Sequence, residues 1–252
     1  MLTRHCTYNK EEKTMEKFLI AGLKTEYNVF YDRLEEHSEP YKAEFDGEAD
    51  IKITLTEEDY LRRQEKSPKV PLDIIEYVAV GTVFNRELMN HNGIMLHSSC
   101  VEKDGYAYLF SADCGTGKST HTHLWLKNLS GTRIINDDKP ALRLEDGVWY
   151  AHGTPFSGKH NESTNTKVPI RAIVFIKRGE ENKVSRMPVA EAVKVIFKQL
   201  LSARDREIGF KLLEKVDLLL TMVPVFTLEC NMDDDAAITS YNEIERLIKN
   251  ED

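Results

Sequence analysis

Residues 105–120 read GYAYLFSADCGTGKST, and this stretch decides the fold. An apolar run, Tyr106–Ser111, leads into a glycine-rich turn and then into Gly-Lys-Ser-Thr at residues 117–120. We expect Lys118–Leu129 to form a helix that ends at Ser130-Gly131. A strand, a glycine-rich loop and a helix in this order are the context in which a Walker A match gains weight. The stretch therefore predicts a strand–loop–helix unit that binds phosphate.

The residues of this loop suit a polyphosphate. Glycines at 115 and 117 leave successive backbone N–H groups open to a phosphate. The helix that begins at Lys118 adds its N-terminal N–H groups and a partial positive charge. Lys118 can reach the β- and γ-phosphates, and the Ser119 hydroxyl can bind magnesium. We therefore expect ATP and Mg2+ as cofactors, bound by residues Ala112, Asp113, Cys114, Gly115, Thr116, Gly117, Lys118, Ser119 and Thr120.

One position departs from the Walker A pattern G-x-x-x-x-G-K-[ST], because Ala112 stands where the first glycine would be. If that position required a positive φ, alanine would cost on the order of 1 kcal/mol. An alternative interpretation is a glycine turn at a helix start with a chance lysine. Cys114 lies near this helix start and could act as a redox-sensitive thiol, although a small buried cysteine is the simpler account.

Paired acids follow the next predicted strand. Residues 134–138 read IINDD, two apolar residues followed by Asn136, Asp137 and Asp138. A carboxylate at a strand end is where a Walker B aspartate holds magnesium. A second carboxylate beside it can act as a general base, because the nearby negative charge raises its proton affinity. A solvated turn before Pro140 is the alternative. Upstream, His97 lies in the apolar segment MLHSS, where it is either a core or surface histidine or part of the site.

Composition excludes several classes of protein. The chain has 252 residues, 41% of them hydrophobic and 30% charged, which is typical of a globular protein rather than a disordered one. Its net charge of −8 argues against general nucleic-acid binding. No apolar run approaches the roughly 20 residues of a membrane helix, and the polar start lacks the apolar region of a secretory signal. None of the four cysteines forms a CxxC pair. We therefore expect a cytoplasmic protein with no membrane or nucleic-acid partner.

The order of predicted elements favours an α/β fold of mixed sheets with α+β character, because hairpins occur beside strand–helix units. We expect a polar tail over residues 1–15, an accessory α+β layer over 16–92 and a catalytic core over 93–252. Asp104-Gly105 and Asp146-Gly147 predict hairpin turns. The predicted strands lie in Lys17–Val29, Asp50–Thr56, Gly93–Val101, Tyr106–Ser111, Thr132–Asn136, Ala141–Leu144, Val148–Ala151, Val168–Lys177 and Val223–Glu229. The predicted helices are Tyr31–His37, Pro71–Asn90, Lys118–Leu129, Pro188–Leu201, Ile208–Leu220 and Asp234–Lys249.

Together these pieces resemble the C-terminal catalytic domain of the HPr kinase/phosphorylase family, whose P-loop fold is shared with phosphoenolpyruvate carboxykinase. In that family a strand histidine precedes the phosphate loop by fifteen residues, and here 112 − 97 = 15. The resemblance covers roughly residues 93–230. It implies that Asp137, helped by His97, activates an acceptor hydroxyl. It also implies that Asp138 lies near the metal. From the chemistry of the loop, Lys118 is expected to be catalytic by neutralising charge on the phosphoryl group in transfer, and Ser119 is expected to bind the metal.

A second segment extends the resemblance. Gly153–Lys159 reads GTPFSGK and is similar to a motif of small kinase-like relatives. This similarity implies that Lys159 lies near the transferred or acceptor phosphate, whereas an exposed loop lysine is the alternative. The chain departs from the family at Ala112 and Cys114 and has no counterpart of its downstream Gly-Arg-Asn signature. The resemblance therefore does not extend to HPr as the substrate, to hexamers or to phosphorylase activity.

Three functions remain open from the sequence. The first is an ATP-dependent kinase of the HPr serine kinase type, which acts on the serine hydroxyl of a small protein or peptide. The second is a small-molecule kinase of the carboxykinase-like fold, with a narrow basic acceptor pocket built from Lys159, Arg171 or Arg178. The third is a nucleotide-binding sensor or scaffold without turnover. The acceptor and the oligomeric state stay open.

Overall fold

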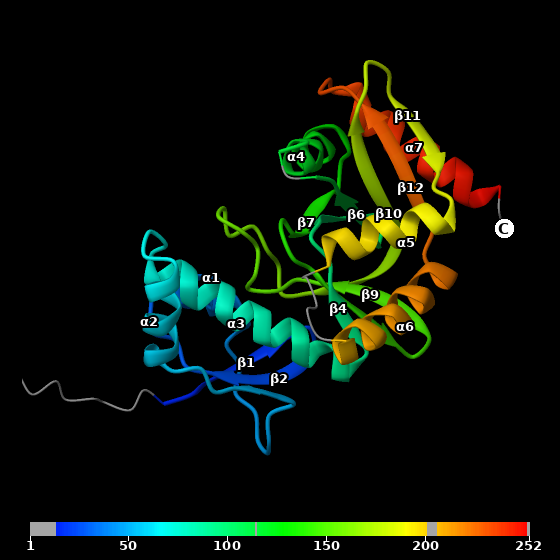
Figure 1. The fold of residues 1–252 in the computed structure, drawn as a ribbon. Helices are drawn as coiled ribbons and strands as arrows, with labels where there is room; N and C mark the ends of the chain where they lie inside the picture. The colour runs from blue at the N-terminus through cyan, green and yellow to red at the C-terminus, as the bar shows by residue number, and fades with distance from the viewer. Residues whose placement is uncertain (1–13, 114, 201–205, 251–252) are drawn as a thin grey trace, which may run out of the picture.

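Two β-sheets organise the chain in the computed structural model, which describes residues 14–113, 115–200 and 206–250 (Figure 1). The smaller sheet, of order β1-β2-β3, belongs to the N-terminal layer of residues 16–92. Helix α2 in this layer begins with a capping box, in which the side chains of Thr56 and Asp59 each accept the other's backbone N–H. The elements of the layer are β1 (Glu16–Ile20), β2 (Leu23–Tyr27), α1 (Asp32–Ser38), the 3-10 turn η1 (Glu39–Tyr41), β3 (Ile51–Ile53), α2 (Glu57–Lys66), α3 (Leu72–Leu88) and the 3-10 turn η2 (Met89–His91).

The larger sheet has nine strands in the order β4-β8-β9-β10-β6-β5-β7, with β12 paired to β10 and β11 to β12. Its longest strand, β10, pairs antiparallel with β9 over Lys167–Pro169 and parallel with β6 from Ile170 onward, so it links the two parts of a curled mixed sheet. The strands are β4 (Gly93–Met95), β5 (Ser99–Lys103), β6 (Tyr106–Ser111), β7 (Arg133–Asn136), β8 (Ala141–Glu145), β9 (Val148–His152), β10 (Lys167–Arg178), β11 (Lys183–Arg186) and β12 (Val225–Cys230). The helices are α4 (Lys118–Asn128), α5 (Val189–Gln199), α6 (Arg206–Met222) and α7 (Asp235–Lys249).

Side-chain alternation along the central strands explains why helices cover both faces of this sheet. Leu109 and Phe175 face one side and pack in a cluster with residues of α5 and α6. Tyr108, Phe110 and Val174 face the other side and pack with residues of α4 and α7. The helices lie on these two sides in Figure 1. Because both faces are buried, the central strands are almost wholly apolar.

The three central strands β6, β10 and β12 run parallel. Their carboxyl ends meet at one edge of the sheet, since Phe175 pairs with Ser111 and Arg178 pairs with Cys230. This edge is where open α/β sheets bind ligands, because the loops that follow the strands converge there. The predicted phosphate loop follows Ser111 and therefore lies at this edge.

The N-terminal layer packs against the larger sheet through α3. Gly81 of this helix lies against the Phe156 ring, so close that an added Cβ would come within 2.9 Å of it. Met95, Ala141 and Phe156 share a buried cluster with Val80 and other residues of α3. The loop after β9 is thus fixed to the N-terminal layer.

The structure confirms the predicted α/β class with mixed sheets, and it differs from the sequence analysis in detail. Gly93–Val101 forms two strands rather than one, because the chain leaves β4 at Leu96 and enters β5, which belongs to the other part of the sheet. Helix α2 and strand β11 were not predicted. Cys114, Leu201 and residues 1–13 of the predicted tail lie outside the described residues. In the described part of the chain, no helix has the length and apolar character needed to cross a membrane.

Candidate functional site

The predicted phosphate loop, residues 112–120, spans the connection from β6 to α4 and the first turn of that helix. Gly115 and Gly117 have φ of +74° and +123°, in the region that favours glycine. The N–H of Thr116 donates to the Asp113 carbonyl at 3.1 Å and closes a turn. Ala112 is not among the described residues with positive φ, so the alanine in place of the first motif glycine carries no such strain.

The start of α4 presents backbone donors to this loop. Gly117 is the N-cap residue, and it supplies no side-chain cap. The first backbone bond of the helix runs from the His121 N–H to the Gly117 carbonyl at 2.9 Å. The N–H groups at residues 118–120 precede that bond and lie at the positive end of the helix dipole. Together with Lys118, they form the kind of helix start that binds anions.

Side chains from the C-terminal ends of β10 and α5 contact the loop. The Arg178 guanidinium donates to the carbonyl of Gly115 at 2.8 Å and reaches that of Thr116 at 3.5 Å. Lys198 of α5 pairs with the Asp113 carboxylate at 2.7 Å. Because Arg178 binds the carbonyl of Thr116, the adjoining N–H of Gly117 points the opposite way in the planar trans peptide.

Asp137 joins the loop to the end of β7. One of its carboxylate oxygens accepts a hydrogen bond from the Ser119 hydroxyl at 3.0 Å, and the other accepts one from the Ser99 hydroxyl at 2.6 Å. The side chain is buried, at 8% exposure. A buried carboxylate needs such donors to replace the hydrogen bonds that it made to water. Ser119 and Asp137 thus form a compact pair of oxygen donors beside the loop.

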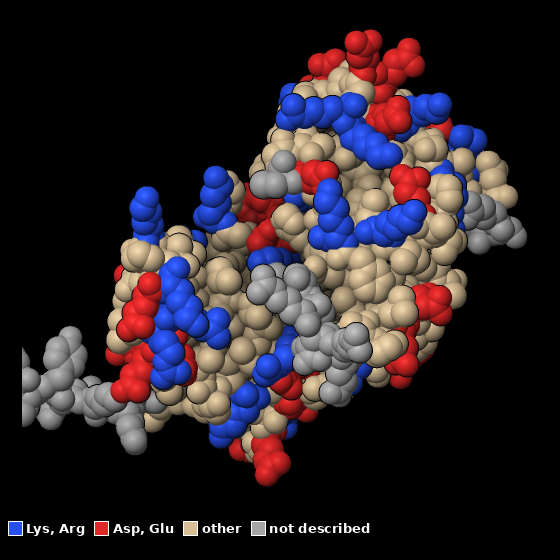
Figure 2. Space-filling model, viewed as in Figure 1, with Lys and Arg blue, Asp and Glu red and all other residues tan. Residues whose placement is uncertain are grey.

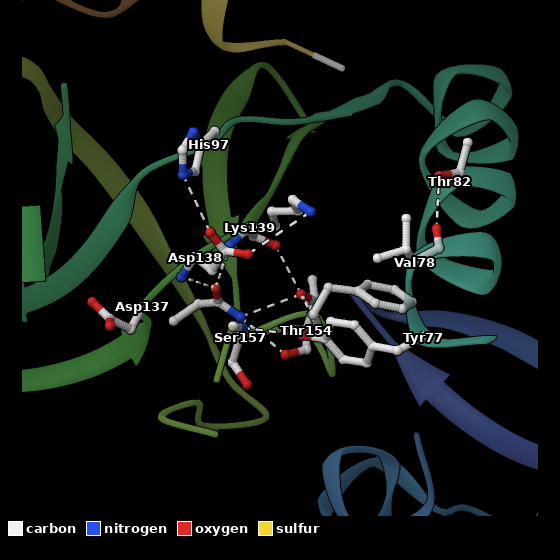
Figure 3. Close-up of polar contacts among 12 residues, drawn as sticks. Tyr77, Val78, Thr82, His97, Asp137, Asp138, Lys139, Thr154 and Ser157 are labelled. Atoms are coloured by element: carbon white, nitrogen blue, oxygen red, sulfur yellow. Dashed lines mark hydrogen bonds and ion pairs between the residues drawn. The ribbon is translucent and has the colours of Figure 1, made fainter. Parts of the chain in front are cut away.

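Asp138 points to a different side of the chain from Asp137, as Figure 3 shows. Its Oδ1 lies 3.3 Å from Nε2 of His97, and its Oδ2 lies 3.8 Å from Nζ of Lys139. The two neighbouring acids therefore meet different partners, one at the loop and the other at His97.

A turn built by Asn136 separates the two carboxylates. The fully buried side-chain oxygen of Asn136 accepts the N–H groups of Asp138 and Lys139 at 3.0 and 2.7 Å. Its amide group donates to the Thr154 carbonyl at 2.9 Å. An Asx turn of this kind redirects the backbone directly after a strand. It explains why Asp137 and Asp138 do not share one ligand.

His97 is held from its other side by α5. Its backbone N–H donates to the Gln199 carbonyl at 3.3 Å, and its Nδ1 lies 3.2 Å from Oε1 of the same residue. His97 therefore lies between α5 and Asp138, with one ring nitrogen toward Gln199 and the other toward the Asp138 carboxylate.

These two residues face a cavity of about 390 Å3, which we call the His97 cavity. Its described lining consists of Met95, His97, Asp138, Lys139, Lys198, Gln199 and Leu200. The face of the molecule in Figure 2 is hollowed between α3 and α5, with acidic side chains inside the hollow and Lys or Arg side chains over α5 at its border. A volume of this order suits a side chain or small ligand.

The loop after β9 closes the site near Asp138. An added Cβ on Gly158 would lie 3.1 Å from Cβ of Asp138, so only glycine fits without displacing the acid. The next residue, Lys159, has an exposed side chain. The expected place for Lys159 near a phosphate therefore stays a prediction. Arg171 does not belong to this site, because it pairs with Glu245 at 2.9 Å and lines a different cavity with Tyr106.

The residues available for a metal are few. Among the described residues no group of three or more His, Cys, Asp and Glu side chains could hold a metal ion. Magnesium at phosphate sites commonly uses one or two protein oxygens, with phosphate and water completing the shell. The Ser119 hydroxyl and the Asp137 carboxylate fit that requirement.

Sequence reasoning missed several residues that shape the site. Ser99 and Asn136 lie beside the predicted residues in the chain, but nothing in their type marked them. Tyr77 and Gln199 come from segments far away in the sequence and contact the site through the fold. Gly158 did carry a signal, because a glycine in the segment GTPFSGK is the residue type that adopts the φ of +79° found there.

No family model matches the chain, and no curated protein matches it either. Among solved structures it is similar to the Hpr(Ser) kinase/phosphatase from Coxiella burnetii, at 10% identity and a TM-score of 0.36. The match covers 62% of this chain and 98% of that one. A similarity at this TM-score and identity assigns no function to the chain. A functional assignment must therefore rest on the geometry of the site.

Proposed function

We propose that this chain is an ATP- and magnesium-dependent phosphotransferase that acts on a hydroxyl, with a serine of a small protein or peptide as the acceptor. One observation carries the proposal: Ser119 of the phosphate loop binds Asp137 at 3.0 Å, while the adjoining Asp138 faces the His97 cavity. Phosphoryl transfer requires a loop that binds phosphates, oxygen ligands for a metal ion and a base beside the acceptor pocket. In this proposal residues 93–252 are the catalytic core and 16–92 an accessory layer.

The contacts favour different roles for the two acids from those that the resemblance implied. Asp137 is buried against Ser99 and Ser119, so an acceptor hydroxyl cannot easily reach it. Asp138 lines a cavity and touches His97. A general base has to come within hydrogen-bond distance of the proton that it takes. We therefore propose Asp138 as the base and Asp137 as the carboxylate on the metal side.

Each residue of the site then has a separate role in the proposed reaction. The backbone N–H groups at the start of α4 and the Lys118 ammonium bind the phosphates. Ser119 and Asp137 offer oxygens to magnesium, which when bound neutralises charge on the phosphoryl group in transfer. Asp138 takes the proton of the acceptor hydroxyl. His97 contacts the carboxylate through Nε2 and orients it, while Gln199 fixes the imidazole ring.

A small-molecule acceptor is the second candidate. The His97 cavity is lined by Lys139 and Lys198, and two ammonium groups favour an acceptor that carries negative charge. A bound nucleotide without turnover is the third. The experiment below separates the third candidate from the other two, because it measures binding and transfer independently.

The test compares Lys118→Ala and Asp138→Asn in the full chain. ATP binding with Mg2+ is measured by calorimetry, and transfer is measured as ADP release and as label incorporated into a mixed serine-peptide library. We expect Lys118→Ala to weaken ATP binding by about tenfold or more, because the loop loses its cation. We expect Asp138→Asn to keep ATP binding and to reduce transfer by about a hundredfold or more.

Two matched controls accompany these variants. Lys127→Ala changes an exposed lysine further along α4, which pairs with Asp234. Asp146→Asn changes an exposed aspartate at a hairpin tip, where asparagine tolerates the φ of +49°. Unchanged ATP affinity in Lys118→Ala would refute the loop assignment. Tight ATP binding without ADP release and without transfer to any peptide would support the sensor instead.

A further inference from the structure

A second cavity, of about 420 Å3, opens on the other flank of the phosphate loop. We call it the Met232 cavity. It lies at the carboxyl ends of β10 and β12, beside α4. Thr116 and Gly117 of the loop form part of its wall, and the rest includes Leu124, Ile176, Arg178 and Met232. The parallel strands place it at the same sheet edge as the loop.

Shared lining residues connect the site to this cavity around the loop. A third hollow, of about 360 Å3, shares Lys198 and Gln199 with the His97 cavity. The same hollow shares Thr116, Ile176 and Arg178 with the Met232 cavity. The acceptor side and the Met232 side therefore lie at opposite ends of one run of cavities. A triphosphate whose terminal phosphate meets Asp138 would have its other end toward Met232.

The wall of the Met232 cavity is suited to a flat aromatic group. Leu124 and Ile176 supply apolar surface, and no carboxylate belongs to its described lining. The Arg178 guanidinium is planar and can stack on an aromatic ring. Since the same guanidinium binds the Gly115 carbonyl, it ties this wall directly to the phosphate loop.

Met232 itself is an apolar side chain left largely in solvent, at 59% exposure. The turn that carries it is fixed, because the N–H of Asn231 donates to Asn182 at 3.1 Å and Oδ1 of Asn231 accepts the N–H of Asp233 at 3.1 Å. Its sulfur lies 3.7 Å from where a Cβ of Gly117 would be, so it stands over the loop. A flexible thioether on a fixed turn makes favourable contacts with aromatic rings.

We propose that the Met232 cavity binds the base of the nucleoside triphosphate, with Met232, Leu124 and Arg178 as the residues that contact it. This inference rests on the proposed function, since it requires a triphosphate in the loop. It assigns to the chain a nucleoside site separate from the phosphate contacts, and it predicts that the base contributes to affinity.

The test compares ATP with inorganic tripolyphosphate, each with Mg2+, by calorimetry on the full chain. Tripolyphosphate fills the loop but has no base. We expect ATP to bind about tenfold more tightly, since the base buries apolar surface. Met232→Ser should reduce the ratio of ATP affinity to tripolyphosphate affinity to about threefold or less and leave tripolyphosphate affinity unchanged. Met232→Leu should retain the wild-type ratio.

Met222→Ser is the matched control, because Met222 is 44% exposed and lines a cavity away from the loop. Equal affinities for ATP and tripolyphosphate in the wild-type chain would overturn the inference alone. An unchanged ratio of the two affinities in Met232→Ser would also overturn the inference alone. If neither ligand binds, the proposed function fails and this site fails with it. Met232 is exposed, so its substitution should leave the fold intact.

Discussion

The hydroxyl of Tyr77 accepts a hydrogen bond from the backbone N–H of Gly158 at 3.0 Å, which links α3 to the loop beside Asp138. His37 of α1 holds the same loop, with its Nδ1 2.9 Å from the Pro155 carbonyl. Burial lowers the pKa of His37, so the imidazole is neutral and donates one proton to that carbonyl. Figure 3 shows Tyr77 on the opposite side of this loop from His97. The N-terminal layer thus supports the backbone against which the proposed base rests.

The first prediction concerns Gly158→Ala. The new Cβ would lie 3.1 Å from Cβ of Asp138, and the φ of +79° would be strained for alanine. We expect transfer to fall by about tenfold or more while ATP affinity stays unchanged, because only the acceptor side is displaced. Gly47→Ala is the control: its φ is +81°, and no described atom lies within 4 Å of its added Cβ. Equal activity of the two variants would contradict the close contact at Asp138.

The second prediction concerns Tyr77→Phe. The change leaves the Gly158 N–H without its partner, so the free energy of unfolding should fall by about 1 kcal/mol. Transfer should fall more than ATP affinity, because the loop rests on Asp138 and not on the phosphate loop. Denaturant unfolding and the two functional assays measure both effects. Tyr241→Phe removes a hydroxyl contact to Asp104 on the surface and should change neither. A loss of ATP affinity equal to the loss of transfer would contradict the positioning role.

Local sequence was sufficient to predict the elements on which the phosphate loop depends. The hairpin turn before β6 has φ of +52° at Asp104 and +80° at Gly105, as the Asp-Gly pair requires. The positive φ at Gly115 and Gly117 follows from the same chemistry. These features depend on residues close together in the chain, where backbone preferences dominate.

The different contacts of Asp137 and Asp138 could not be predicted in the same way. It depends on the Asn136 turn and on Ser99, which pairs with Asp137 only after β5 and β7 have joined. Arg171, one of the three basic residues considered for an acceptor pocket, lies away from the loop for a related reason. Arg171 lies early in the long strand β10 and pairs with Glu245 of α7, so strand length and direction carry it away from the loop.

The third prediction concerns Ser119→Ala and magnesium. The variant loses one of two proposed protein oxygens for the metal, and Asp137 loses the hydrogen bond from Ser119. We expect the Mg2+ concentration for half-maximal ATP binding to rise by about threefold or more, because fewer oxygens hold the ion. A Mg2+ titration of ATP binding measures the change. Ser130→Ala, at an exposed position beyond α4, is the control. An unchanged Mg2+ requirement would show that Ser119 does not bind the metal.

The last prediction concerns His121 of α4 and acid stability. The side chain is 3% exposed, and burial lowers its pKa to about 4. The Trp125 indole N–H donates to its Nε2 at 3.1 Å, so a proton on that nitrogen would face another donor.

The unfolded chain takes up this proton near pH 6.5, whereas the folded chain takes it up near pH 4. Stability is therefore full above pH 6.5 and falls as the pH drops toward 4, by about 3 kcal/mol from this residue. His121→Gln keeps an acceptor for Trp125 but cannot be protonated, so its unfolding free energy should change less between pH 7 and 4. His160→Gln, at an exposed site, should keep the wild-type slope. A His121→Gln profile parallel to the wild type would show that His121 does not set this acid sensitivity.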